Sequence, residues 1–205
     1  MGRYRREPET VLTCAEEAIA LSEEHGFAEW LPWGRFHRGW ALAELGQINQ
    51  GAAEMEVGIA GFRGLGGVPR QQYAIASLAW VYARMGRTEN ALTMLDAALT
   101  HVERSGEKCE LAEMQRLRGE ILLMRDGSAI EEAERCFRSA IELARVQEAK
   151  WWELRATVSL ARLLRDTNRG DEARAMLAEI YGWFTEGFDT ADLKEAKALL
   201  DDLTG

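Results

Sequence analysis

The 205-residue sequence has few of the residues that interrupt helices or form cross-links: three prolines, three cysteines and three histidines. Because proline breaks helices, its scarcity beside abundant Ala, Leu, Glu and Arg favours helix through most of the chain. The cysteines, Cys14, Cys109 and Cys136, lack any zinc-binding spacing. We expect them to be unpaired thiols in a reducing compartment.

The chain also lacks excess positive charge and long apolar runs. Its net charge of −9 argues against a nucleic-acid partner, which would require a positive surface. The longest apolar stretch, around Ala74 to Ala83, is about half the length of a membrane span, and no signal peptide is recognisable. The sequence therefore predicts a cytoplasmic protein that binds neither membrane nor nucleic acid.

Sequence motifs of catalysis are absent as well. No GxxxxGK[ST] motif occurs, and the glycine cluster at 61, 64, 66 and 67 precedes Pro69, as expected of a linker between units. His25, His37 and His101 have no partner at a metal-binding spacing and are expected at the surface or at its boundary. We therefore expect no enzymatic activity, no cofactor and no metal site.

A short phrase recurs four times along the chain: a small residue, a large one three positions later, a turn, and then alanine in the next helix. The first small residues are Gly39, Ala79, Gly119 and Ala161, at steps of 40, 40 and 42. Each unit is interpreted as two antiparallel helices whose small residues let the helix axes approach closely. The first helices are predicted near 28–45, 69–85, 110–124 and 150–166, and their partners near 48–63, 88–104, 129–147 and 170–184.

The two ends of the array differ from its interior. Residues 9–26 align without gaps on 89–106, the second helix of a unit, so the sequence starts within a repeat. A last amphipathic helix closes the other end. We predict one domain, 1–205, with a half repeat 1–26, units 27–66, 67–106, 107–148 and 149–187, and a capping helix 188–205.

This pattern resembles the tetratricopeptide repeat (TPR), lengthened to about 40 residues. The segments RREPET, GWALAELGQ (39–47) and IYGWFTEGFDTADLKEAKALLDDL (180–203) are similar to the C-terminal repeat regions of bacterial predicted signalling ATPases, often fused to adenylate/guanylate cyclase domains. The resemblance implies an all-α, right-handed superhelical solenoid. It also implies a sensor or docking region at the C-terminal part of a larger protein.

In TPR superhelices the first helix of each unit lines the concave groove. In this sequence, the positions six and three residues before the first small residue of a unit and one residue after it form one stripe of that helix. The stripe is aromatic in the first half of the chain and charged in the second. Aromatic rings beside polar groups suit a recognition groove, but large rings are mostly buried in a packed core and charged stripes mostly face solvent, so both alternatives stay open. The predicted binding residues are Trp33, Phe36, Trp40, Tyr73, Trp80, Arg84, Arg116, Glu120 and Arg162.

We therefore predict a non-catalytic repeat scaffold that binds a protein or peptide and regulates a larger ATPase or cyclase-like signalling protein. Two alternatives remain open: a small-molecule sensor with a Trp-rich groove, and a dimerisation scaffold with no separate ligand. The N-terminal helix carries two apolar stripes, one with Leu12, Ala15 and Ile19 and one with Val11, Ala18 and Leu21. One of them has no evident partner, which predicts a two-fold homodimer through this helix.

Overall fold

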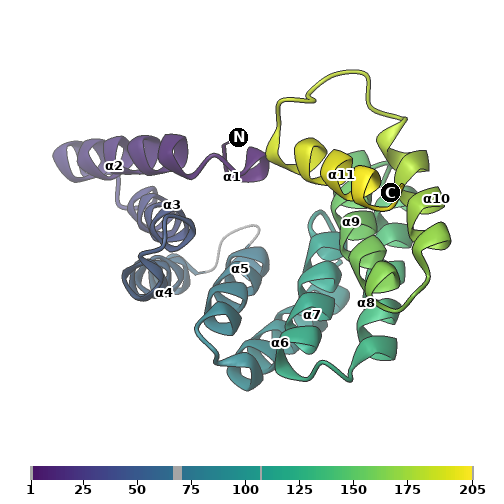
Figure 1. Cartoon of the computed structure of the whole chain (residues 1–205). Helices are drawn as coiled ribbons and strands as arrows, with labels where there is room; N and C mark the ends of the chain where they lie inside the picture. The colour runs from purple at the N-terminus through teal and green to yellow at the C-terminus, as the bar shows by residue number, and fades with distance from the viewer. Residues whose placement is uncertain (1, 67–70, 107, 205) are drawn as a thin grey trace. The chain divides into compact units, whose positions relative to one another are not determined.

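The structure, a computed structural model, describes residues 2–66, 71–106 and 108–204. These ranges contain helices, turns and loops and no strand. The all-α fold of helix hairpins predicted from the sequence is thereby confirmed. The helices are α1 (Gly2–Arg5), α2 (Pro8–His25), α3 (Leu31–Glu44), α4 (Ile48–Gly64), α5 (Gln71–Arg84), α6 (Thr88–Ser105), α7 (Leu111–Arg125), α8 (Ile130–Val146), α9 (Lys150–Asp166), α10 (Gly170–Tyr181) and α11 (Ala191–Asp202) (Figure 1).

The predicted helix positions agree with the observed ones to within a few residues. Consecutive helices pack on each other as hairpins: α3 on α4, α5 on α6, α7 on α8 and α9 on α10. The capping helix predicted within 188–205 is α11. Two details differ: α10 ends at Tyr181 and not near 184, and the four-residue α1 was not predicted. The predicted start of one helix at residue 69 lies outside the described residues.

The chain divides into two compact units, Met1–Gly106 and Glu107–Gly205. The division coincides with the predicted boundary between the repeat units 67–106 and 107–148. Unit 1 contains α1 to α6, and unit 2 contains α7 to α11. The prediction of one continuous domain stays a prediction.

The core of unit 1 depends on a close crossing of α3 and α4. A Cβ atom placed on Gly39 would lie 2.6 Å from the carbonyl oxygen of Gly51, and one on Gly58 would lie 2.7 Å from the backbone nitrogen of Phe36. No side chain fits at such distances, so the two backbones touch directly. The small residues of the repeat phrase thus serve the close approach predicted from the sequence.

Helix ends in unit 1 follow a regular pattern. Gly26, Gly46, Gly66, Gly86 and Gly106 all have positive φ angles and follow one another at intervals of 20 residues. Glycine adopts this left-handed conformation without steric cost, and it ends a helix by reversing the chain. The linker interpretation of the glycine cluster was partly wrong, because Gly61 and Gly64 belong to α4 and a Cβ on Gly61 would meet Pro32 at 2.6 Å. Gly67 and Pro69 lie outside the described residues.

The core of unit 2 is formed by α8, α9, α10 and α11. Phe137, Leu154, Leu164 and Leu177 are fully buried, and α11 closes this core with its own apolar side. Leu193, Ala196 and Leu199 supply that side. The terminal helix therefore acts as the cap that the sequence predicted.

Candidate functional site

The predicted aromatic stripe lies on α3 and α5 of unit 1, but much of it is core. Phe36 has no exposed surface, and Trp40 and Tyr73 are 9% and 7% exposed. Trp33 and Trp80 are half-buried, and the Trp33 ring packs on Phe62 with centroids 4.4 Å apart. Phe36 therefore cannot contact a ligand in this structure. The core explanation of the rings, which sequence reasoning kept open, holds for it.

Tyr73 is covered by α1, which sequence reasoning missed. The guanidinium of Arg3 lies 4.4 Å from the centroid of the Tyr73 ring, and the ring of Tyr4 stacks on Tyr73 at 6.5 Å. Arg3 also donates a hydrogen bond of 3.0 Å from Nη1 to Oγ of Ser77 on α5. The basic N-terminal residues thus hold α1 against α5 by cation–π contacts and a hydrogen bond.

The predicted charged stripe of unit 2 is paired within itself. Arg116 on α7 donates from Nε and Nη2 to the two carboxylate oxygens of Glu113, both at 2.8 Å, and Arg155 on α9 lies 3.0 Å from Glu113. Glu120 accepts hydrogen bonds from Arg116 at 3.2 Å and from Ser159 at 2.6 Å. These side chains join α7 to α9.

The remaining charged members of the predicted stripe also have partners. Arg162 on α9 pairs with Glu195 on α11. Arg84 on α5 pairs with Glu44 of α3 at 2.6 Å. Because a paired charge must give up its partner to meet a ligand, these arginines are weaker candidates for ligand contacts than their positions alone suggested.

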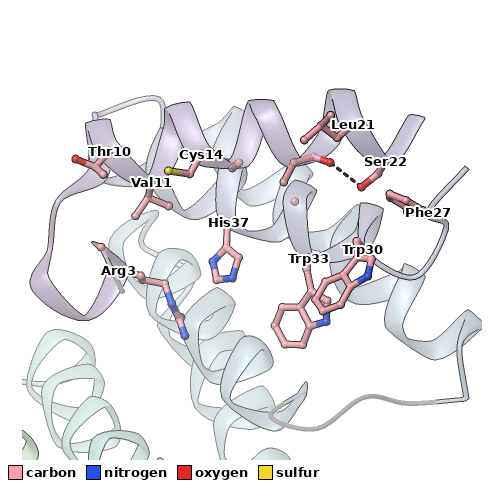
Figure 2. Close-up of a pocket in the computed structure, with 14 residues that line it drawn as sticks. Arg3, Thr10, Val11, Cys14, Leu21, Ser22, Phe27, Trp30, Trp33 and His37 are labelled. Atoms are coloured by element: carbon pink, nitrogen blue, oxygen red, sulfur yellow. Dashed lines mark hydrogen bonds between the residues drawn. The ribbon is translucent and has the colours of Figure 1, made fainter. Parts of the chain in front are cut away.

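A hollow of about 540 Å³ in unit 1 is the strongest candidate site (Figure 2). It follows α2 from Thr10 to Ser22 and has Trp30, Trp33 and His37 on the side of α3. The lining is largely apolar, and it includes three large side chains that are otherwise left to solvent: Leu21, Phe27 and Trp30 are 53%, 48% and 60% exposed. An apolar concavity with a few polar groups is the usual form of a ligand site.

Two basic side chains, His37 and Arg3, line the hollow. His37 is surrounded by rings, with Trp33 stacked on it at 5.9 Å and Phe36 edge-on at 5.3 Å. Burial, together with the positive charge of Arg3, lowers the pKa of His37 to about 4. His37 is consequently neutral at pH 7. Arg3 is then the one lining residue that is charged at this pH.

Of the predicted binding residues, Trp33 alone lines this hollow. Sequence reasoning missed the other side chains because it applied the TPR groove offsets, which start in the first complete unit. The available signal was that α2 carries two apolar stripes and only one evident partner: Val11, Ala18 and Leu21 of one stripe line the hollow. The stripe without a partner was interpreted as a dimer contact, an interpretation that nothing in the structure tests.

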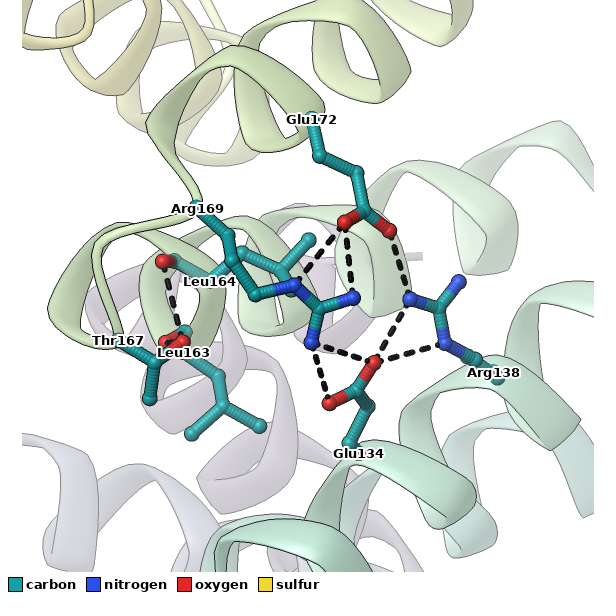
Figure 3. A network of polar contacts seen from close by, with 7 residues as sticks. All are labelled: Glu134, Arg138, Leu163, Leu164, Thr167, Arg169 and Glu172. Atoms are coloured by element: carbon teal, nitrogen blue, oxygen red, sulfur yellow. Dashed lines mark hydrogen bonds and ion pairs between the residues drawn. The ribbon is translucent and has the colours of Figure 1, made fainter.

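The described residues of unit 2 contain a ring of ion pairs on the surface between α8 and α10 (Figure 3). Arg169 reaches Glu134 and Glu172, both at 2.8 Å, and Arg138 reaches the same two carboxylates, both at 2.7 Å. Burial acts to raise the pKa of Glu134, but the hydrogen bonds from Arg138 and Arg169 outweigh it and lower that pKa. With every charge in it paired, the ring connects helices and offers little to a ligand.

Metal-binding clusters and membrane-spanning helices are both absent from the described ranges. No group of three or more His, Cys, Asp or Glu side chains is placed to hold a metal ion in the described ranges. Within the same ranges no helix combines the length and apolar character needed to cross a membrane. The three cysteines are free thiols, with Cys14 and Cys109 exposed and Cys136 buried.

Comparison with known proteins supports the fold and gives no family. No protein-family model matches the sequence, and no curated protein matches it either. Among solved structures, PlcR of Bacillus thuringiensis, crystallised in complex with the peptide PapR7 and DNA, has a TM-score of 0.80 at 15% identity, over 100% of this chain and 71% of that chain. BtubC (BKLC) from P. vanneervenii has a TM-score of 0.68 at 16% identity, over 98% and 89%. The chain therefore has a TPR-like helical-repeat fold.

Proposed function

We propose that this chain is a non-catalytic repeat scaffold that binds a peptide in the hollow of unit 1. The observation that carries the proposal is the concentration of exposed Leu21, Phe27 and Trp30 around one apolar concavity. Large apolar side chains left in water at one place usually mark a contact surface. The structural likeness to PlcR, which was crystallised with a peptide, agrees with this assignment.

Selection of peptides from a displayed library on the purified chain tests the proposal. We expect Trp30→Ala to lower the affinity of selected peptides about tenfold or more, since truncating an anchoring aromatic removes a dominant contact. Trp183→Ala is the matched control, because Trp183 is 57% exposed and belongs to unit 2. Equal binding by both variants would contradict the assignment of the site.

The partly exposed members of the predicted groove remain proposed secondary contacts. They are Trp80 and Arg84 in unit 1, and Glu120 and Arg162 in unit 2, whereas Trp33 lines the hollow itself. We also propose that the scaffold regulates a larger ATPase or cyclase-like signalling protein, as the resemblance of its C-terminal segment implies. A nucleotide-binding motif in the same reading frame upstream would support this context.

A small-molecule sensor is the second candidate function. The hollow, at about 540 Å³, falls within the range of small-ligand sites, roughly 300–1,000 Å³. Its aromatic walls and the neutral His37 suit a flat, weakly polar molecule. Stabilisation by a metabolite in a thermal-shift screen, lost in a variant that fills the hollow such as Ala18→Trp, would favour this function over peptide binding.

A further inference from the structure

One position shows that α2 is incompletely covered. Residues 9–26 align with 89–106, so Ala18 of α2 corresponds to Ala98 of α6, and the 40-residue repeat adds Gly58 of α4. Ala98 is 2% exposed and Gly58 is buried, whereas Ala18 is exposed and lines the hollow. The same repeat position is therefore covered on two helices of unit 1 and open on the third.

The covering element in both complete hairpins is a helix. On α4 it is α3, because a Cβ on Gly58 would meet the backbone of Pro32 and Phe36 at 2.7 Å. On α6 it is α5. The other side of α2 already packs on α3, where a Cβ on Gly34 would lie 2.7 Å from the Ile19 side chain. The face of α2 that carries Ala18 corresponds to the face that α4 and α6 each pack against a covering helix. The hollow lies on this face of α2, away from Ile19.

The charges indicate what kind of helix fits. α2 contains five glutamates and neither Lys nor Arg: Glu9, Glu16, Glu17, Glu23 and Glu24. The covering helices have the opposite balance, with two Arg against one Glu on α3 and one Arg with no acidic residue on α5. A pair of this type joins one complete hairpin, where Arg38 of α3 meets Glu54 of α4 at 2.6 Å.

Resting on the proposed peptide-binding function, we propose that the hollow binds a basic amphipathic α-helix that packs antiparallel to α2. The lining from Thr10 to Ser22 spans about 18 Å at 1.5 Å per residue, which is three turns or so of the bound helix. A small residue facing Ala18 permits close approach, and basic residues face Glu17 and Glu24, which flank Leu21 on α2. This geometry reproduces the hairpin of α5 with α6.

The antiparallel orientation of the bound helix is taken from the hairpins of unit 1, and it agrees with the positive charge of Arg3 at one end of the hollow. An antiparallel helix brings its C-terminus to the N-terminal end of α2, where Arg3 lies. Helix C-termini carry partial negative charge, so a cation stabilises them. A second copy of the chain suits the site less well, because the two acidic α2 helices of a two-fold dimer would repel each other.

The probe is a fluorescently labelled synthetic peptide with the sequence of residues 71–87, QQYAIASLAWVYARMGR, because α5 covers α6 in the native hairpin. Fluorescence anisotropy measures its affinity for the whole chain. We expect Ala18→Trp, which fills the hollow, to weaken binding at least about tenfold. The double variant Glu17→Lys/Glu24→Lys should weaken it about three- to tenfold and flatten its salt dependence.

Two controls keep the result interpretable. Glu131→Lys makes the same kind of charge change on an exposed residue of α8 and should leave binding unchanged. A peptide carrying Ala76→Glu should bind weakly, because Ala76 corresponds to Phe36, whose backbone contacts Gly58, and the substitution puts a bulky charged group opposite Ala18. Circular dichroism establishes that each protein variant is folded.

Undiminished binding by Ala18→Trp would overturn the inference. If library peptides depend on Trp30 but the residue 71–87 peptide does not bind, the proposed function stands and the helical ligand is wrong. If the wild type is a dimer that Ala18→Trp dissociates, the occupant is a second copy and the inference is likewise wrong. Sedimentation of both proteins decides that case.

Discussion

The two units use different means to hold similar helix hairpins together. Unit 1 contains 13 of the 19 glycines, and its central hairpin depends on direct backbone contact at Gly39, Gly51 and Gly58. Unit 2 joins its helices through buried or half-buried ion pairs centred on Glu113 and Glu153. One repeat pattern therefore tolerates either small residues or matched charges at helix contacts.

The different helix contacts of the two units also affect how much surface each leaves open to a ligand. Charged pairs in unit 2 satisfy one another across α7, α9 and α11, so its stripe is largely closed to a ligand. Unit 1 leaves apolar surface uncovered along α2 and after it. The proposed binding site therefore lies in unit 1, whose helix contacts are largely apolar.

The largest effect should come from breaking the buried charge cluster of unit 2. Glu113 is 3% exposed and pairs with Arg116 and Arg155. We expect Glu113→Ala to lower the free energy of unfolding by about 4 kcal/mol, because the buried guanidinium of Arg116 loses its two short hydrogen bonds to Glu113 and keeps the longer one to Glu120. Urea unfolding measures the loss, with the exposed Glu131→Ala as control. A loss below about 1 kcal/mol would mean that charge pairing does not support unit 2.

Next in size is a test of backbone contact in unit 1. Gly39→Ala would place a Cβ 2.6 Å from the carbonyl oxygen of Gly51, and we expect a cost of about 3 kcal/mol. Gly64→Ala on α4 is the matched control, since a Cβ there meets nothing within 4 Å and alanine favours helix. If both variants melt at the wild-type temperature, α3 and α4 do not approach as closely as the structure has them.

Acid should affect unit 1 before it affects unit 2. The pKa of His37 falls from 6.5 to about 4 on folding, so the folded state resists its protonation. The stability this contributes is complete above pH 6.5 and decreases as the pH falls toward 4, by about 2 kcal/mol between pH 7 and pH 5. The carboxylates Glu134 and Glu172 of unit 2, whose pKa values are lowered, lose their contribution only below their ordinary range near 4.5.

Hydrogen exchange at pH 7 and pH 5 measures this difference for each unit separately. The amides of α3 and α4 should lose protection at pH 5 while those of α8 to α10 keep theirs. His37→Gln should remove most of the pH dependence of unit 1. An unchanged dependence in that variant would assign the acid sensitivity to another group.

The helices were predictable because a repeat presents the same evidence four times. Gly39, Ala79, Gly119 and Ala161 recur in register, and each marks the first helix of an observed hairpin. The hollow was only partly predictable. Its location on α2 could be inferred from the apolar stripe with Ala18 and Leu21, but the contributions of Arg3 and His37 depend on how α1 folds back, which no periodicity encodes. The sequence predicted a charged stripe with Arg116, Glu120 and Arg162, but the pairing of Arg116 with Glu113 and Glu120 required the three-dimensional structure.

The smallest effect is expected for the surface ring of ion pairs in unit 2. Comparing it with the Glu113 cluster distinguishes exposed from buried ion pairs. Arg138 is 43% exposed and pairs with Glu134 on its own helix and with Glu172 on α10. Since solvent screens such pairs, we expect Arg138→Ala to cost less than about 1 kcal/mol and the cost to vanish in 1 M salt. Arg174→Ala, an exposed arginine of α10, is the control and should change nothing. Urea unfolding at low and high salt measures both variants. A loss comparable to that of Glu113→Ala would show that the ring holds α8 to α10, and the distinction between the buried cluster and the surface ring would then fail.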